Sequence, residues 1–146
     1  MSLLQQIFRS RVNLKHHRRI AGTGSYTTHI DASSGQYAIE LIIGTRNESG
    51  AHLECTAFLV PEPERLDIPG SVAVHISGCK IGYLSRGDGQ RYRDFLASAP
   101  RGGPALCDAL ISGGWIRDGG EGCFVVQLDL AWPLRFDETI PLEMAA

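Results

Sequence analysis

Three side chains that could perform acid–base chemistry lie close together in the chain. Glu62 and Asp67 belong to a proline-rich stretch, and His75 belongs to the apolar run that follows it. General acid–base catalysis requires such groups within hydrogen-bond reach of a reacting atom, together with a third group that orients them. The sequence offers no such arrangement, and its glycines do not follow the phosphate-loop or dinucleotide-binding patterns. We therefore expect a protein without catalytic activity of its own.

The four cysteines, at positions 55, 79, 107 and 123, could in principle bind a metal or form disulfides. No two of them have the close spacing of a zinc site, and no histidine pair lies near them. Cys55 and Cys123 instead begin strand-like apolar runs, where a free thiol behaves as a small hydrophobic side chain. The sequence predicts reduced, partly buried cysteines, no metal and no cofactor.

Positive charge is concentrated at the N-terminal end of a chain whose formal net charge is −2. The first 35 residues hold five basic side chains against Asp31 alone, so the remainder of the chain is acidic. Such a cluster can attract phosphate groups. It can equally be a solvated arm, because Phe8 is the only aromatic residue among the basic positions. The basic side chains are Arg9, Arg11, Lys15, Arg18 and Arg19.

The elements that would position these residues are mostly β-strands. Runs rich in β-branched or aromatic residues, bounded by Gly, Pro, Asn, Asp or Ser, recur at short intervals. Ser77-Gly78-Cys79 is a connection short enough for a hairpin, so the third and fourth runs should pair antiparallel. Glycines on both sides of Ile116-Arg117-Asp118 predict a long hairpin between the last two runs. The expected strands are 37–44, 52–60, 71–77, 80–84, 105–112 and 123–130.

The segment from Ser85 to Ser98 instead has Tyr92, Phe95 and Leu96 at helical spacing, after a residue that can cap a helix. The sequence therefore predicts a mainly β fold. We expect a small six-stranded OB-like or SH3-like β-barrel with one helix inserted between strands four and five. Residues 1–36 would form a basic N-terminal arm with a short helix, residues 37–132 the barrel domain, and residues 133–146 a C-terminal tail.

Length and composition place limits on the class of protein. With 146 residues, 43% of them hydrophobic and 21% charged, the chain is expected to form one globular domain. No apolar run approaches the roughly 20 residues that span a bilayer. The N-terminus also lacks the apolar core and cleavage site of a secretory signal. We therefore expect no membrane association and a cytoplasmic location.

The order of these elements resembles the HIRAN domain over roughly residues 37–130. The matching residues are Ile42, Ile43 and Gly44, the pair Glu62-Pro63, the run Val72–Val74, and Ile81-Gly82-Tyr83-Leu84. This family is known as a small OB-like β-barrel attached to helicases and nucleases, and it also occurs in short stand-alone bacterial proteins. Its best-understood members capture the 3′ end of single-stranded DNA. The resemblance implies single-stranded DNA, or another nucleic acid, as a partner.

The resemblance also implies a set of binding residues. Arg46 falls where the family has an arginine that helps to hold DNA, and Arg86 falls near a basic position that can face phosphate. The family's loop for the DNA end aligns with Arg65 to Ile68, where an apolar residue replaces an aspartate that would accept hydrogen bonds. The implied nucleic-acid-binding residues are Arg46, Asn47, Arg65, Asp67, Tyr83 and Arg86.

Two functions remain open on this basis. A non-catalytic nucleic-acid-binding module would use these residues, together with the basic arm and with Arg91 and Arg93. A protein-interaction or scaffold module would use Leu66 and Ile68, which form a small apolar surface in an otherwise polar loop. These two side chains could equally fill the end of the barrel.

Overall fold

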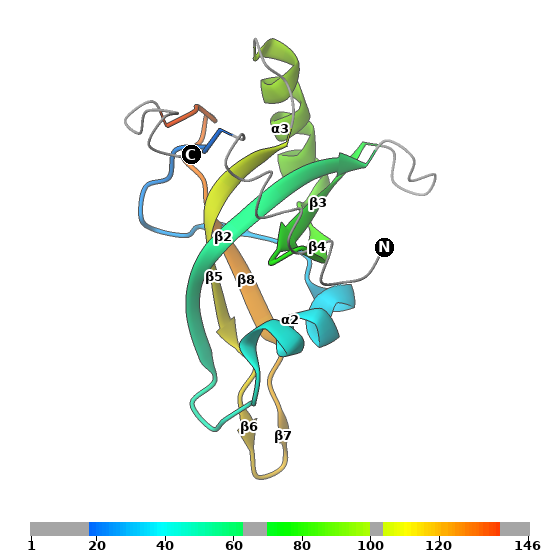
Figure 1. Cartoon of the computed structure of the whole chain (residues 1–146), viewed down its shortest axis with the longest axis vertical. Helices are drawn as coiled ribbons and strands as arrows, with labels where there is room; N and C mark the ends of the chain where they lie inside the picture. The colour runs from blue at the N-terminus through cyan, green and yellow to red at the C-terminus, as the bar shows by residue number, and fades with distance from the viewer. Residues whose placement is uncertain (1–17, 63–69, 100–103, 138–146) are drawn as a thin grey trace.

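The computed structural model describes residues 18–62, 70–99 and 104–137 of the chain. Its main feature is one antiparallel sheet of six strands that curls around an apolar core, with two short α-helices (Figure 1). The strand order is β1-β8-β5-β2-β3-β4, and β6 and β7 form a separate two-stranded ladder. The mainly β prediction is confirmed. The strands are β1 (Thr28–His29), β2 (Ala51–Glu62), β3 (Ser71–Ile76), β4 (Cys79–Tyr83), β5 (Ala105–Gly113), β6 (Ile116–Arg117), β7 (Gly120–Glu121) and β8 (Phe124–Asp129).

Alternate residues of the long strands fill the inner face of the sheet. Leu59 of β2 lies opposite Val74 of β3, and Ile111 of β5 lies opposite Val126 of β8, and all four are buried. This is the pattern expected when one face of a strand with period two packs on a core. Ala73, on the other face of β3, is buried as well, whereas His75 on that face is partly exposed.

Both predicted hairpins are confirmed. β3 and β4 pair antiparallel across a two-residue turn in which Ser77 and Gly78 have φ values of 53° and 79°. Positive φ at both positions matches the turn to the right-handed twist of the strands. β5 and β8 also pair antiparallel, and β6 and β7 extend that hairpin beyond the main sheet.

One predicted strand is wrong: residues 37–44 do not form a strand, because Gln36–Ile43 form the helix α2. A strand would place positions 37, 39 and 41 on one face, yet only Ile39 is buried there. Ile39, Ile42 and Ile43 instead recur at helical spacing, and all three pack on the core. Gly44, at a φ of 95°, follows the helix directly. The sixth strand of the sheet is β1, which lies within the expected N-terminal arm of residues 1–36.

The second helix, α3 (Arg86–Ser98), follows β4 and precedes β5 in the chain. Ser85 caps its first turn by accepting a hydrogen bond from the backbone N–H of Asp88 at 3.2 Å. Tyr92 is fully buried, and Phe95 and Leu96 pack against the core, as their helical spacing predicts. Within the described ranges, no helix is both long and apolar enough to cross a membrane.

The two ends of the described chain pack on the same sheet. Leu106 of β5 accepts a hydrogen bond from Ile20 at 2.8 Å and donates one to the carbonyl of Arg18 at 3.0 Å. Ala21 in turn donates to the carbonyl of Arg135 at 2.9 Å, and Ile20 is only 2% exposed. Residues 18–21 and 131–137 are therefore layered on the end of the sheet nearest α3.

The segment after β1 joins the two edges of the curled sheet. Thr28 lies opposite Leu128 of β8, and three residues later Asp31 exchanges two backbone hydrogen bonds with Tyr83 of β4, at 2.9 and 3.0 Å. The backbones approach so closely there that a Cβ atom at Gly82 would collide with the carbonyl oxygen of Asp31. The edge-to-edge connection therefore requires glycine at position 82.

We expect Gly82→Ala to lower the free energy of unfolding by about 1–3 kcal/mol, because an added methyl group must displace a backbone carbonyl. Gly87→Ala is the matched control, since its Cβ meets no atom within 4 Å and the residue lies in α3. It should leave stability unchanged or raise it by up to about 1 kcal/mol. Urea unfolding followed by circular dichroism measures both, and equal stabilities would contradict the role of Gly82.

Asp129, at the end of β8, holds the loop that precedes β1. Its carboxylate accepts hydrogen bonds from the backbone N–H groups of Thr23, at 2.9 Å, and Gly24, at 2.8 Å. A Cβ atom at Gly22 would collide with this carboxylate. Burial would raise the pKa of Asp129, but the hydrogen bonds from the loop outweigh it, so that the pKa lies below its ordinary value.

The lowered pKa of Asp129 predicts a pH dependence of stability. The carboxylate stabilises the fold fully above the unfolded pKa of about 4, and this contribution is lost as the pH falls through the lower pKa of the folded state. We expect Asp129→Asn to be less stable by about 1–3 kcal/mol at pH 7 and to converge on the parent protein in acid. Urea titrations of both proteins between pH 7 and pH 2 test this, and a difference independent of pH would contradict it.

Candidate nucleic-acid interface

Arg46 is engaged in contacts within the protein. Its guanidinium donates to the carbonyl of Gly122 at 2.9 Å and lies 4.5 Å from the centre of the Phe124 ring. Glu40 of α2 is 3.6 Å from the Nε atom, and only 11% of the Arg46 side chain is exposed. These contacts tie the loop after α2 to the β7–β8 connection.

Asn47 also holds the loop between α2 and β2. Its side-chain oxygen accepts a hydrogen bond from the N–H of Gly50 at 2.7 Å, and its carbonyl accepts one from Ile116 of β6 at 2.9 Å. Arg117 donates to the carbonyl of Glu48 at 3.0 Å and lies over the ring of Trp115. Arg46 and Asn47 therefore lie at the β6–β7 end of the molecule, opposite α3 (Figure 1).

Tyr83 belongs to a polar cluster on the outer face of β2, β3 and β4. Lys80 lies 3.0 Å from a carboxylate oxygen of Glu62 and 5.3 Å from the centre of the Tyr83 ring. Hydrogen bonds with Tyr83 and Glu62 raise the pKa of Lys80. Burial, and then the charge of Lys80, lower the pKa of His75. Because Glu62 neutralises Lys80, this cluster presents little net charge to a phosphate.

The remaining predicted site residues are not brought together with Arg46. Arg86 is exposed in the first turn of α3, close in sequence to Tyr83 but on the other side of the molecule from the β6–β7 hairpin. Arg65 and Asp67 lie outside the described residues, as do Leu66 and Ile68 of the protein-interaction hypothesis. The structure thus separates Arg46 and Asn47 from Tyr83 and Arg86.

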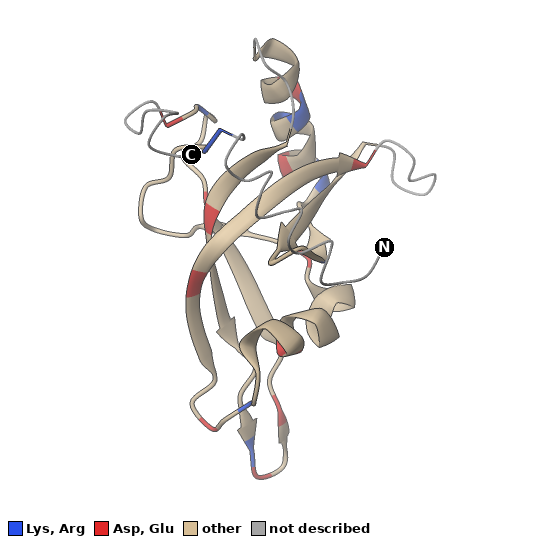
Figure 2. Cartoon of the chain, viewed as in Figure 1, with Lys and Arg blue, Asp and Glu red and all other residues tan. Residues whose placement is uncertain are grey.

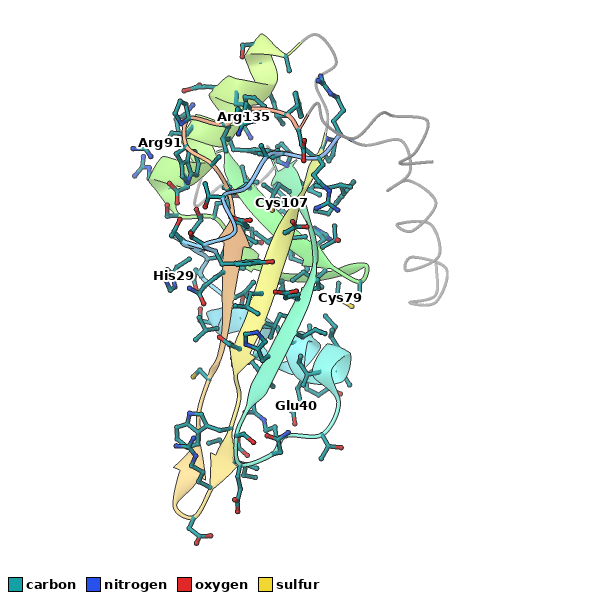
Figure 3. The ribbon with its side chains drawn as sticks, turned by 90° about the vertical axis from the view of Figure 1, so that its left-hand side faces the viewer. His29, Glu40, Cys79, Arg91, Cys107 and Arg135 are labelled. Atoms are coloured by element: carbon teal, nitrogen blue, oxygen red, sulfur yellow. The ribbon has the colours of Figure 1, made fainter. Side chains whose placement is uncertain are left out.

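A different group of arginines lies against aromatic rings on α3 and the segment 131–136. The guanidinium of Arg91 is 5.4 Å from the ring centre of Trp132, and that of Arg18 is 3.7 Å from the ring centre of Phe136. Phe136 also packs against Phe95 of α3, with ring centres 4.8 Å apart. Figure 3 shows Arg91 and Arg135 at the same end of the molecule. The arginine–aromatic surface consists of Arg18, Arg91, Trp132, Arg135 and Phe136.

One ring of this surface is fixed by a hydrogen bond, and two of its arginines are exposed. Trp132 donates a hydrogen bond from its indole Nε1 to the hydroxyl of Thr28 at 3.0 Å, which fixes the ring. Arg91 is 3.9 Å from Asp88 but keeps 68% of its side chain exposed. Arg135 is exposed and forms no ion pair with any residue that the structure describes. The sequence contains a signal for this surface, because residues 132–136 combine two aromatic residues with an arginine.

The cysteines differ in exposure. All four are free thiols, with Cys107 buried, Cys55 and Cys79 partly buried and Cys123 exposed. Burial raises the pKa of the Cys55 thiol to about 11, which keeps it protonated at neutral pH. In the parts of the chain that are described, no three His, Cys, Asp or Glu side chains are grouped so that they could hold a metal ion.

Comparisons with protein-family models, curated proteins and solved structures find no match for this chain. The HIRAN resemblance therefore depends on the chain's own residues. One part of it fails, because Ile42 and Ile43 lie in α2 rather than in a first strand. Other matching residues lie in strands, with Val72–Val74 in β3 and Ile81 to Tyr83 in β4.

The contacts of Arg46 predict a structural effect of its replacement. We expect Arg46→Gln to lower the free energy of unfolding by about 1.5–3 kcal/mol, the usual value of a hydrogen bond to a charged group. Arg86→Gln is the control, because Arg86 is exposed and its stability effect should stay within about 0.5 kcal/mol. Thermal and urea unfolding of the two variants distinguish them, and an unchanged Arg46 variant would contradict this assignment.

Proposed function

We propose that this chain is a non-catalytic nucleic-acid-binding module that contacts single-stranded nucleic acid through the arginine–aromatic surface. The observation that supports this most directly is the placement of Arg18 and Arg91 over the rings of Phe136 and Trp132. A guanidinium held over a ring loses little freedom on binding, and its N–H groups can reach phosphate oxygens. Trp132 and Phe136 belong to the residue class on which bases stack.

The distribution of charge also favours the arginine–aromatic surface as the place where nucleic acid binds. Figure 2 shows basic positions on α3, with Asp88 and Asp94 among them, whereas β2 and β5 carry acidic positions. Arg86 and Arg91 extend along α3, and Arg135 adds an exposed charge beside them. A strand of nucleic acid that follows α3 would therefore meet cations and avoid the carboxylates of the sheet.

The HIRAN relation is part of this proposal. A HIRAN-like module would share the strands β3 and β4 and the glycine of the Gly82-Tyr83 pair with that family. Arg65 and Asp67, which align with the family's loop for the DNA end, lie outside the described residues. The proposal therefore concerns contacts with the backbone and bases of a strand and not recognition of its 3′ end.

Binding should depend strongly on salt and on two exposed arginines. We expect a fluorescently labelled single-stranded oligothymidylate to bind at about 50 mM salt and to dissociate as salt rises, because bound counterions are released. Replacing Arg91 and Arg135 together with glutamine should weaken binding roughly tenfold. It should also reduce the slope of log affinity against log salt by about 1.4, or roughly 0.7 for each lost phosphate contact. Fluorescence anisotropy over a range of salt measures both quantities.

The matched control is Arg117→Gln, because Arg117 also lies over a tryptophan, at 4.7 Å from the ring centre of Trp115. It is on the β6–β7 hairpin, away from α3, so its loss should leave affinity and salt slope unchanged. Absence of binding at about 50 mM salt would refute the function, since affinity is strongly enhanced there. Equal binding by the control and the double variant would contradict the assignment of binding to the arginine–aromatic surface.

A further inference from the structure

β2 is longer than the strand beside it on one side. β5 pairs with β2 from Ala51 to Leu59, whereas β3 pairs with it only from Phe58 to Glu62. Residues 51–57 therefore have a strand on one side only, and no other described segment donates backbone hydrogen bonds to their second edge. Because the backbone groups of successive residues point to opposite edges, this edge presents the N–H and C=O groups of every second residue among 51–57.

The free edge is accessible and has few of the devices that prevent edge pairing. His52, Leu53 and Glu54 are exposed, with Leu53 at 38% although it lies on the apolar face of the strand. Residues 51–57 contain no proline or lysine, and their pairing with β5 is continuous without a bulge. Natural proteins usually protect an edge by such means, because an unprotected one accepts another strand.

The two faces of the edge specify what the added strand should carry. On the inner face, Leu53 and Cys55 would lie beside the new strand and favour apolar side chains. On the outer face, Glu54 is exposed, and Figure 2 shows acidic positions along β2 and β5. Asp108 of β5 is paired with Arg19, so Glu54 is the carboxylate of β2 that an added strand would face. Opposite charges facing each other across two strands are favourable.

We propose that residues 51–57 of β2 bind an extended peptide as an additional strand, in which apolar and basic side chains alternate. The apolar side chains lie beside Leu53 and Cys55, and a lysine or arginine lies beside Glu54. Backbone hydrogen bonds supply the affinity, and the alternating faces supply the specificity. A second copy of this chain is a poorer occupant, because antiparallel self-pairing centred on Glu54 would place two carboxylates opposite each other.

A titration of the full chain with two synthetic peptides tests this proposal. The sequence Thr-Val-Lys-Val-Lys-Val-Thr has the required alternation, and Thr-Val-Glu-Val-Glu-Val-Thr is its acidic match. We expect the lysine peptide to bind at least tenfold more tightly and to slow amide hydrogen exchange, measured by NMR, within residues 51–57. Equal binding by the two peptides, or protection located elsewhere, would overturn the proposal.

Two variants connect the result to the edge. Glu54→Lys should reverse the preference between the peptides, and because Glu54 is exposed the circular dichroism spectrum should be unchanged. Replacing Arg91 and Arg135 with glutamine should leave peptide binding unaltered, which separates this site from the nucleic-acid surface. An unaltered preference in Glu54→Lys overturns the charge assignment. Sedimentation that shows dimers with residues 51–57 already protected would identify a second copy as the occupant and overturn the peptide proposal.

Discussion

The backbone contact between Asp31 and Tyr83 is the constraint on which the rest of the fold depends. It joins the edge strand β4 to the segment that leaves β1, so the curled sheet is connected from one edge to the other. Two glycines make it possible, because a Cβ at Gly82 would collide with Asp31 and a Cβ at Gly35 would collide with Ile81. The chain then enters α2, where Ile39, Ile42 and Ile43 recur at helical spacing and pack on the core.

The hydroxyl of Tyr92 connects this sheet to the proposed binding surface. It donates to the carbonyl of Leu59 at 2.8 Å and accepts from the N–H of Ala105 at 3.0 Å, where the pairing of β2 and β5 ends. Those two backbone groups would otherwise be buried without partners, at a cost of about 1–3 kcal/mol for each. Burial of Tyr92 fixes the rotation of α3 and thereby turns Arg91 outward beside Trp132.

The sequence predicts the elements whose side chains alternate or recur over a long run, and it misses those fixed by tertiary contact. β3, its hairpin to β4, and α3 follow from local periodicity and turn residues. β1 has only two residues and no apolar pattern, so only its pairing with β8 defines it. The resemblance implies that Arg46 holds DNA, whereas no local pattern indicates its contacts with Gly122 and Phe124, which are more than 70 residues away in sequence. The sequence shows that Trp132 and Phe136 are aromatic, but it does not show that their rings contact Arg91 and Phe95 of α3.

The two proposed sites differ in charge, and this difference decides whether they can act together. The arginine–aromatic surface is cationic, whereas the free edge of β2 bears Glu54 and has Asp108 on the neighbouring strand, paired with Arg19. A nucleic acid is repelled by carboxylates such as Glu54, and a basic peptide is repelled by exposed arginines such as Arg91 and Arg135. On the two proposals, each ligand would be repelled from the other's site, and one copy of the chain would hold both. Such a module would bring a basic polypeptide to a single strand without competition between them.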